Sequence, residues 1–557
     1  MKSDRTLLVL AFAFLAAGCG REMPPPPAAS AAPKRPAHAA AGLGKHHFEI
    51  TTSSKDAQAA FDRGLTLAYS FAHQAAEEEF RKAAQADPKC AMAHWGIALV
   101  NGPHINFPLV PPDNAKRAWE ARAKALELAP SAGEREKGLI AAVSARYADP
   151  QPGDRSPLDR AYAEAMKKLW QAHPNDADLA TLYAEAAMDL RPWDLWTHDG
   201  KPQPGAEEIL ATLEQALKLD PEHPGANHLY IHAVEASPNP ERAVVSADRL
   251  RTLVPAATHM VHMPSHIYAR VGRWDDAGLS NAAAMKADEE YRKAHPKPGL
   301  YAMYMAHNDH FYAYAAMSQG RSADAVAAMR KMVASVPEEF LKEYTVIADG
   351  YMISVSEALM RFGRWDELLK EPEPRPELPL SRAMWHFTRA VALTAQGKLP
   401  EAEKERAAFL EGRKALPKDA AFGNNSAGDI LAIAAKMLDG EMAAKKEKWA
   451  EAEKLLREAV VVEDSLRYDE PPDWIQPVRH TLGAVLLKAG KPAEAEAVYR
   501  EDLRLYPENG WSLFGLSRAL RAQKKESEAD DAEARFKKQW AKADVMLGST
   551  CFCQPGA

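Results

Sequence analysis

The chain has 557 residues, with 70 Lys or Arg against 77 Asp or Glu, a net charge of −7 and 46% apolar residues. A charge this close to balance argues against a large phosphate-binding surface, so we expect no nucleic-acid partner. Only 4 cysteines are present, which excludes a small scaffold held together by disulfides. At roughly 150 residues per domain, the length fits three or four globular domains or one long repeat array.

The first residues have the layout of a secretory signal. Two basic residues precede an apolar run at 7–17, which is too short to span a bilayer. The sequence LAAGC at 15–19 resembles the lipobox of bacterial lipoproteins, which implies lipidation of Cys19; a plain secretory peptide is the alternative. Gly20 is similar to the outer-membrane sorting pattern, so we expect a lipid-anchored envelope protein on the outer membrane, facing the periplasm and touching the membrane only through its lipid.

A Pro- and Ala-rich stretch follows, REMPPPPAASAAPKRPAHAAAGLGK at 21–45, with almost nothing to bury. Such a composition predicts an extended tether. No later segment has 18 uninterrupted apolar residues, so we expect no transmembrane helix. The predicted organisation is a signal peptide at 1–18, a tether at 19–45, a folded body at 46–545 and a C-terminal tail at 546–557.

The body shows helical periodicity with breaks at Pro and Gly, which predicts an all-α fold. Small and large residues recur at the spacing of the 34-residue tetratricopeptide repeat (TPR), a helix-turn-helix unit. Near the start and near the end of the body this spacing is carried by Gly64, Ala76, Phe80, Ala83 and Pro88, and by Leu482, Gly483, Ala495, Tyr499 and Pro507. We therefore predict a right-handed TPR-like α-solenoid of about eleven or twelve helical hairpins.

Histidines recur at the same period in the middle of the body. Pro221 and Pro255 are one full TPR period apart and set the register of two repeats. In that register the first helix of each repeat carries a His-x3-His pair on its inner face. These pairs are His228 and His232, followed by Glu235, and His262 and His266. The next repeat places His307 and His310 at inward positions, and the preceding one places Glu185 there.

Three interpretations of this pattern remain open. Two imidazoles one helical turn apart can hold a metal, and the two pairs with Glu235 and His310 would suit zinc, copper, nickel or iron. Nearby methionines favour copper slightly. Alternatively, a polar groove that includes Glu185, Asn227, Arg270, His307 and Asn308 binds a peptide or a small anion. The third interpretation is purely structural hydrogen bonding.

The sequence contains no Gly-rich phosphate loop, HExxH or GxSxG motif, which favours a non-enzymatic function. If catalysis occurs, a metal-activated water with Glu235 as general base is the simplest scheme. Inserted segments at 193–204 and 371–379 have the character of loops that cover a ligand groove. Cys551 and Cys553 lie in a polar tail, too sparse for a closed zinc site, and we expect that tail to lack packed structure.

Several motifs resemble a family of TPR-domain-containing proteins found in bacteria and plants. They are FDRGLTLAYSFAHQAAEEEF at 61–80, CAMAHWGIALVNGPHIN at 90–106, NHLYIHAVEAS at 227–237, HMVHMPSHIYARVGRWDDA at 259–277, HNDHF at 307–311, YDEPPDW at 468–474 and NGWSLFGL at 509–516. The resemblance implies the solenoid fold and supplies no reaction. We predict an envelope-anchored scaffold that binds a protein, peptide or small ligand through a His-rich concave groove; the alternative is a metal-binding protein or metal-dependent enzyme.

Overall fold

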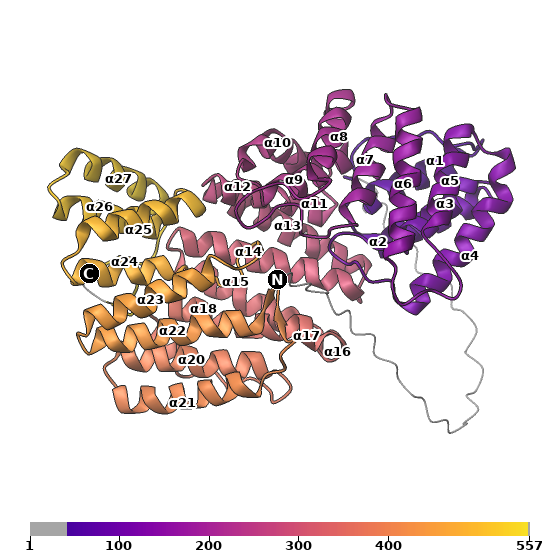
Figure 1. The fold of residues 1–557 in the computed structure, drawn as a ribbon. Coiled ribbons are helices and arrows are strands. Elements are labelled where there is room, and N and C mark those ends of the chain that lie inside the picture. Colours follow the sequence, from indigo (N-terminus) through magenta and orange to yellow (C-terminus); the bar gives the residue numbers. More distant parts are fainter. Residues whose placement is uncertain (1–41, 555–557) are drawn as a thin grey trace, which may run out of the picture.

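The computed structural model describes residues 42–554, which form helical hairpins stacked into a curved array (Figure 1). The predicted signal peptide, Cys19 and nearly all of the predicted tether lie outside the described residues. Within residues 42–554, none of the helices combines the length and the apolar character needed to cross a membrane.

The helices of the N-terminal part are α1 Lys55–Tyr69, α2 His73–Ala86, α3 Ala91–Val100, α4 Pro112–Leu128, α5 Glu134–Ala145, α6 Ser156–Ala172, α7 Ala177–Met188, α8 Ala206–Leu219, α9 Pro224–Glu235, α10 Val244–Leu253, α11 Thr258–His262, α12 Pro264–Arg270 and α13 Trp274–Ala294. Those of the C-terminal part are α14 Ala302–Ser318, α15 Ser322–Ser335, α16 Glu338–Glu343, α17 Thr345–Ala348, α18 Ser354–Arg361, α19 Trp365–Leu368, α20 Pro379–Ala395, α21 Leu399–Ala415, α22 Ala427–Lys445, α23 Trp449–Glu463, α24 Val478–Lys488, α25 Pro492–Leu505, α26 Gly510–Ala522 and α27 Glu526–Gln539.

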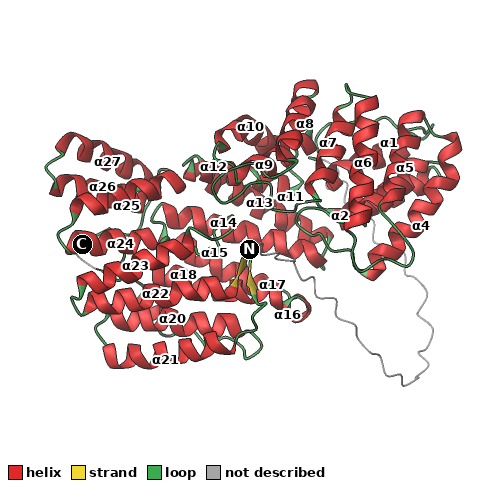
Figure 2. Cartoon of the chain, viewed as in Figure 1, coloured by secondary structure: helices red, strands yellow, loops and turns green. Residues whose placement is uncertain are grey.

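Short elements connect some of these helices. They are the 3-10 helices η2 Ala129–Ser131, η3 Pro240–Ala243, η4 Gly299–Tyr301 and η5 Asp349–Ile353, and the strands β1 Ala421–Phe422 and β2 Asn425–Ser426. The two strands pair antiparallel and form the one small sheet in the described part of the chain (Figure 2).

Neighbouring helices pack in pairs along the chain. The pairs within residues 42–554 are α1/α2, α3/α4, α5/α6, α7/α8, α9/α10, α11–α12/α13, α14/α15, α18/α19, α20/α21, α22/α23, α24/α25 and α26/α27, which makes 12 hairpins. Each hairpin also contacts the next one, as in other repeat proteins. The prediction of a TPR-like α-solenoid of about eleven or twelve hairpins is confirmed.

Aromatic side chains of the second helices fill spaces left by glycines of the first helices. Phe80 of α2 is fully buried between Gly64 of α1 and Gly96 of α3. A Cβ atom would lie 2.8 Å from the Phe80 ring at Gly64 and 2.5 Å from it at Gly96. Tyr499 of α25 packs in the same way against glycines of α24 and α26. The small-and-large spacing seen in the sequence is therefore a close-packing requirement.

The array curves until distant hairpins touch. The Trp274 Nε1 of α13 donates a hydrogen bond to the Pro507 carbonyl at 2.8 Å, and the Trp511 Nε1 of α26 donates one to the Met317 carbonyl at 2.7 Å. The C-terminal hairpins consequently lie beside α13 and α14, although the two regions are far apart in sequence (Figure 1). At the other end, α1 packs against α9. This closure surrounds the inner faces of the central hairpins with protein.

Hydrogen bonds to Asp178 hold the segment that leads into α1. The Asp178 Oδ1 accepts hydrogen bonds from the His46 Nε2 at 2.9 Å, the Tyr69 hydroxyl at 2.8 Å and the His223 Nε2 at 3.1 Å. Burial alone would lower the pKa of His46, but the hydrogen bond to Asp178 and the charge of that carboxylate raise it above 6.5. Burial would raise the pKa of Asp178, but the charge of His223 and the two imidazole hydrogen bonds hold it far below its usual range.

The contact between His46 and Asp178 gives a testable pH dependence of stability. Because folding raises the pKa of His46 above 6.5, the stabilisation is fully present below that value and is lost as pH rises through the raised pKa. We compare the free energy of unfolding of the wild type with that of His46→Gln. The difference between the two proteins should be larger at about pH 5.5 than at about pH 8.5, by about 1 kcal/mol. Urea unfolding of both proteins at the two pH values measures this difference. A difference that does not change with pH would contradict the assignment.

Candidate metal centre

The inner face of the central hairpins is built by the first helices of three consecutive hairpins: α9, then α11 with α12, then α14. Pro224 occupies the first turn of α9, where its missing N–H costs no hydrogen bond. Pro264 separates α11 from α12, because a proline inside a helix removes one backbone hydrogen bond. These helices place their histidines in the interior of the curve, where the rings of His228, His232, His259, His262 and His266 are between 0% and 7% exposed.

His228 and His232 of α9 and His259 of α11 form the first three-histidine set. One nitrogen of each ring lies within 4.8 Å of the others. The His228 Nδ1 donates to the Tyr69 carbonyl at 2.6 Å, and the His232 Nδ1 contacts the Glu235 Oε1 at 2.8 Å. Their Nε2 atoms are buried and have no hydrogen-bond partner, and the same is true of both nitrogens of His259. Each of the three rings therefore has at least one unused nitrogen atom.

His262 and His266 with His307 of α14 form the second three-histidine set, again with ligand atoms within 4.8 Å of one another. The Asn281 Nδ2 donates to the Ala277 carbonyl, so its Oδ1 faces His262 and accepts from the His262 Nδ1 at 2.6 Å. The lone pair of His262 is then on Nε2, which lies 2.8 Å from the His266 Nε2. His307 is partly exposed.

The two sets repeat the same construction. His262 and His266 follow His228 and His232 by one TPR period, as the sequence register predicted. In each set a His-x3-His pair is completed by a histidine from the first helix of the following hairpin. The sets are adjacent: the ring centres of His259 and His262 are 5.8 Å apart, and those of His232 and His266 are 6.1 Å apart.

Glu235 joins the two sets. Its Oε1 contacts the His232 Nδ1 at 2.8 Å and its Oε2 lies 2.7 Å from the His266 Nδ1. Although burial raises the pKa of Glu235, the charges of His266 and His232 lower it to about 2. Burial would lower the pKa of His266, but Glu235 and Glu470 raise it to about 10. Glu235 is thus a carboxylate that orients one imidazole of each set, the role of an outer-shell group in metal proteins.

Burial and the neighbouring imidazoles hold the pKa values of His228, His259 and His262 well below the ordinary value for histidine. Burial has the same effect on the pKa of His307. These four rings are therefore neutral at physiological pH, which is the state that binds a metal ion. His266 instead holds an extra proton, which a metal ion would displace.

Both sets border a cavity of about 620 Å³. Its wall includes Trp193, His232, His259, Tyr304, His307 and Glu470. Trp193 opens the inserted segment at 193–204, so this segment reaches the cavity at its first residue. Residues 371–379 do not line this cavity in the described part of the chain. The cavity has room for a small molecule beside the imidazoles.

The other residues predicted from the sequence lie apart from the two sets. His310 lines the cavity but packs against Tyr351, with ring centres 5.6 Å apart. Glu185 instead borders a separate small pocket next to Arg146. The predicted groove residue Arg270 is structural, because its Nε donates to the Glu235 carbonyl at 3.0 Å. The prediction of one groove shared with the His pairs is therefore wrong for Glu185 and Arg270, because each has its partner on the preceding hairpin.

Asn227 and Asn308 also have local structural partners. The Asn227 Nδ2 donates to the carbonyls of Pro221 and His223, and the Asn308 Nδ2 donates to Asp288 at 2.8 Å. Glu235, predicted as a ligand or general base, contacts His232 and His266, and together with His266 and Glu470 it forms a further group whose possible ligand atoms lie within 4.8 Å of one another. The sequence interpretation did not include His259 as a ligand, although its His-x2-His spacing to His262 places it one turn away on the same helix.

The fold and site together define a TPR-like α-solenoid with a buried polyhistidine cluster. No family model matches the chain, and no curated protein matches it. Among solved structures, the chain is similar to human IFIT1 in its dimer with PPP-AAAA, at 13% identity over 86% of this chain and 90% of that one, with a TM-score of 0.31. It is also similar to a chain of the APC/C hetero-tetramer Cut9-Hcn1, at 14% identity over 84% and 78%, with a TM-score of 0.32. Similarities at this level carry no argument about function.

Proposed function

We propose that the protein binds transition-metal ions at the two three-histidine sets. The observation that carries this proposal is the first set: one nitrogen of each ring lies within 4.8 Å of the others, and each buried ring has an unpartnered nitrogen. The Nδ1 atoms of His228 and His232 are already held by oxygen atoms. An unpartnered polar atom in an interior is costly, and a metal ion would remove that cost. Anchoring of the second ring nitrogen is the usual arrangement of metal-bound histidine.

The chemistry of the ligands indicates which metals the sets could bind. Neutral imidazole suits zinc, copper, nickel and iron. Three protein ligands leave further coordination positions for water or a small molecule. His307 and His232 face the cavity, so a molecule in the cavity could reach those positions. We therefore favour metal binding with access for a small ligand.

Burial of the histidines favours an ion over a peptide. A docking groove presents exposed side chains to its partner, whereas five of these rings are at most 7% exposed. The proposal accordingly takes the metal alternative of the sequence analysis over the protein-binding scaffold. We also propose that lipid on Cys19 anchors the protein in the cell envelope, a proposal supported by the sequence at 7–19.

Elemental analysis of protein purified without chelators tests the metal proposal. We expect one zinc or copper ion per three-histidine set in the wild type, because each set offers three imidazole nitrogens. His228→Ala should empty the first set only, and His228→Ala with His262→Ala should empty both. His386→Ala is the matched control, because His386 pairs with Glu405 between α20 and α21 and belongs to neither set. A double variant with native circular dichroism and unchanged metal content would contradict the proposal.

A further inference from the structure

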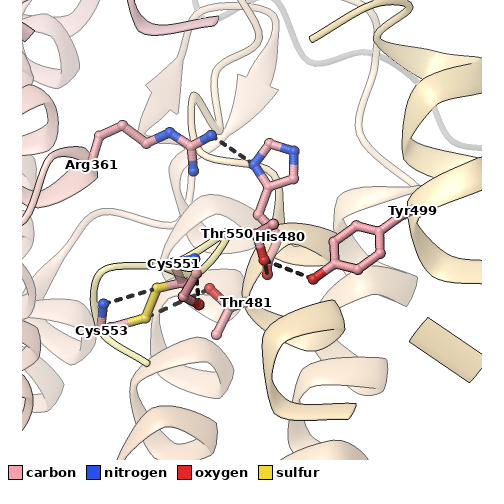
Figure 3. The surroundings of a disulfide bond; sticks show 8 residues. Arg361, His480, Thr481, Tyr499, Thr550, Cys551 and Cys553 are labelled. Atoms are coloured by element: carbon pink, nitrogen blue, oxygen red, sulfur yellow. Dashed lines mark hydrogen bonds between the residues drawn. A yellow bond between two sulfur atoms is a disulfide. The ribbon is translucent and has the colours of Figure 1, made fainter. Parts of the chain in front are cut away.

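The C-terminal segment, expected from the sequence to lack packed structure, is instead folded into the protein, so that expectation is wrong. After α27 the chain returns to α24 and α25, where the Thr550 Oγ1 donates to the His480 carbonyl at 2.7 Å and lies 2.8 Å from the Tyr499 hydroxyl (Figure 3). Phe552 packs onto Gly363 at the end of α18. These contacts bury Cys551 and Cys553, which are 3% and 4% exposed.

The two cysteines form a disulfide across a single intervening residue (Figure 3). A third group meets them from another hairpin: a carboxylate oxygen of Glu441 on α22 lies within 4.8 Å of both sulfur atoms. Three residues that commonly bind metals thus converge from two segments that are far apart in sequence.

Glu441 has no hydrogen-bond partner of its own. Its side chain is 1% exposed, and neither of its carboxylate oxygens has a hydrogen-bond partner. Burial raises its pKa to about 8, and no neighbouring charge offsets that effect. A buried carboxyl group without a hydrogen bond or a counter-charge is costly. The disulfide supplies neither of these, whereas a cation held between the carboxylate and the sulfur atoms would supply the charge.

We propose that Cys551 and Cys553, when reduced, bind one zinc ion together with Glu441. Reduction of the disulfide by a thiol or phosphine reductant takes two electrons and two protons and gives two thiols. Zinc binding then releases the thiol protons and forms two Zn–S bonds, with Glu441 as oxygen ligand and water in the remaining position. The two positive charges of the ion offset two of the three negative charges on the thiolates and the carboxylate. This Cys2Glu site is independent of the histidine sets, which contain no sulfur.

Cobalt titration of the full protein under reducing conditions tests the site, because Co²⁺ occupies zinc sites and a cobalt–thiolate bond gives a near-ultraviolet charge-transfer band that histidine ligands do not give. We expect this band to saturate at one cobalt per chain in His228→Ala with His262→Ala, where the histidine sets do not compete for the ion. It should be lost in Cys551→Ser and in Cys553→Ser, and Glu441→Gln should weaken cobalt binding about tenfold or more. Cys90→Ser is the matched control, because Cys90 is the free buried cysteine elsewhere in the described chain.

The band should remain in His228→Ala with His262→Ala, so failure of the histidine proposal and failure of this one are distinguishable. A reduced wild type without the band, or a Cys551→Ser protein that keeps it, would overturn the Cys2Glu site and leave only a structural disulfide. A second measurement does not depend on any variant: zinc should slow alkylation of the two thiols in the reduced wild type. Equal alkylation rates with and without zinc would also overturn the proposal.

Discussion

Glu235→Gln is expected to weaken zinc binding at both three-histidine sets by about ten- to a hundredfold, the usual cost of removing an outer-shell carboxylate. Glu235 is the group shared by the two sets, since its two oxygens contact the Nδ1 atoms of His232 and His266. Glutamine has nearly the same shape but only one acceptor oxygen and no charge. The variant therefore removes the acceptor oxygen from one imidazole and the negative charge from beside both.

Competition with a chromophoric zinc chelator measures the affinity of each set. The matched control is Glu405→Gln, because Glu405 also accepts from a histidine, His386, but lies outside the cavity. That control should bind zinc like the wild type. Affinities in Glu235→Gln that equal those of the wild type at both sets would show that the carboxylate has no role in metal binding and that its contacts are structural.

The repeat architecture could be predicted because close packing leaves a local mark in the sequence. A hairpin whose helices approach closely needs a small residue opposite a large one, and Gly64 with Phe80 shows this requirement directly. The TPR period then predicted that His228 and His262 occupy equivalent positions in consecutive repeats. In the structure each of them belongs to one of the two three-histidine sets, on the first helix of its hairpin.

Closure of the array could not be predicted in the same way. The hydrogen bond from Trp274 to the Pro507 carbonyl joins segments that are separated by several repeats, and periodicity within one repeat carries no information about such contacts. The sequence consequently indicated an open groove, whereas the imidazoles are buried. The contact of Glu235 with His266 could not be predicted for a related reason, because it depends on how two neighbouring hairpins meet.

The packing of the C-terminal segment could not be predicted from its composition either. Residues 546–554 are short and contain several polar residues, a pattern typical of a loose tail. Their packing depends on Phe552 and Thr550 finding partners on α18, α24 and α25. None of these partners is near the tail in sequence, so a local pattern could not identify them.

Phe80→Ala is expected to reduce the free energy of unfolding by about 3 to 5 kcal/mol, because it empties a fully buried aromatic site. Gly96→Ala should reduce the free energy of unfolding by about 1 to 3 kcal/mol, because the added methyl would overlap the Phe80 ring. Urea unfolding followed by circular dichroism measures both. Gly153→Ala is the control, because no atom lies within 4 Å of a Cβ built there.

A double variant shows whether Gly96→Ala lowers stability through overlap with the Phe80 ring or through an effect on α3 alone. Phe80→Leu removes ring atoms at the place where the Gly96→Ala methyl would enter, so the combined variant should lose less stability than the sum of the two single changes, by about 0.5 kcal/mol or more. If the losses instead add, the ring and the methyl do not compete for space, and the glycine serves some other need of α3. Sub-additive losses would establish that the hairpins are held together by an aromatic ring that only two glycines can accommodate.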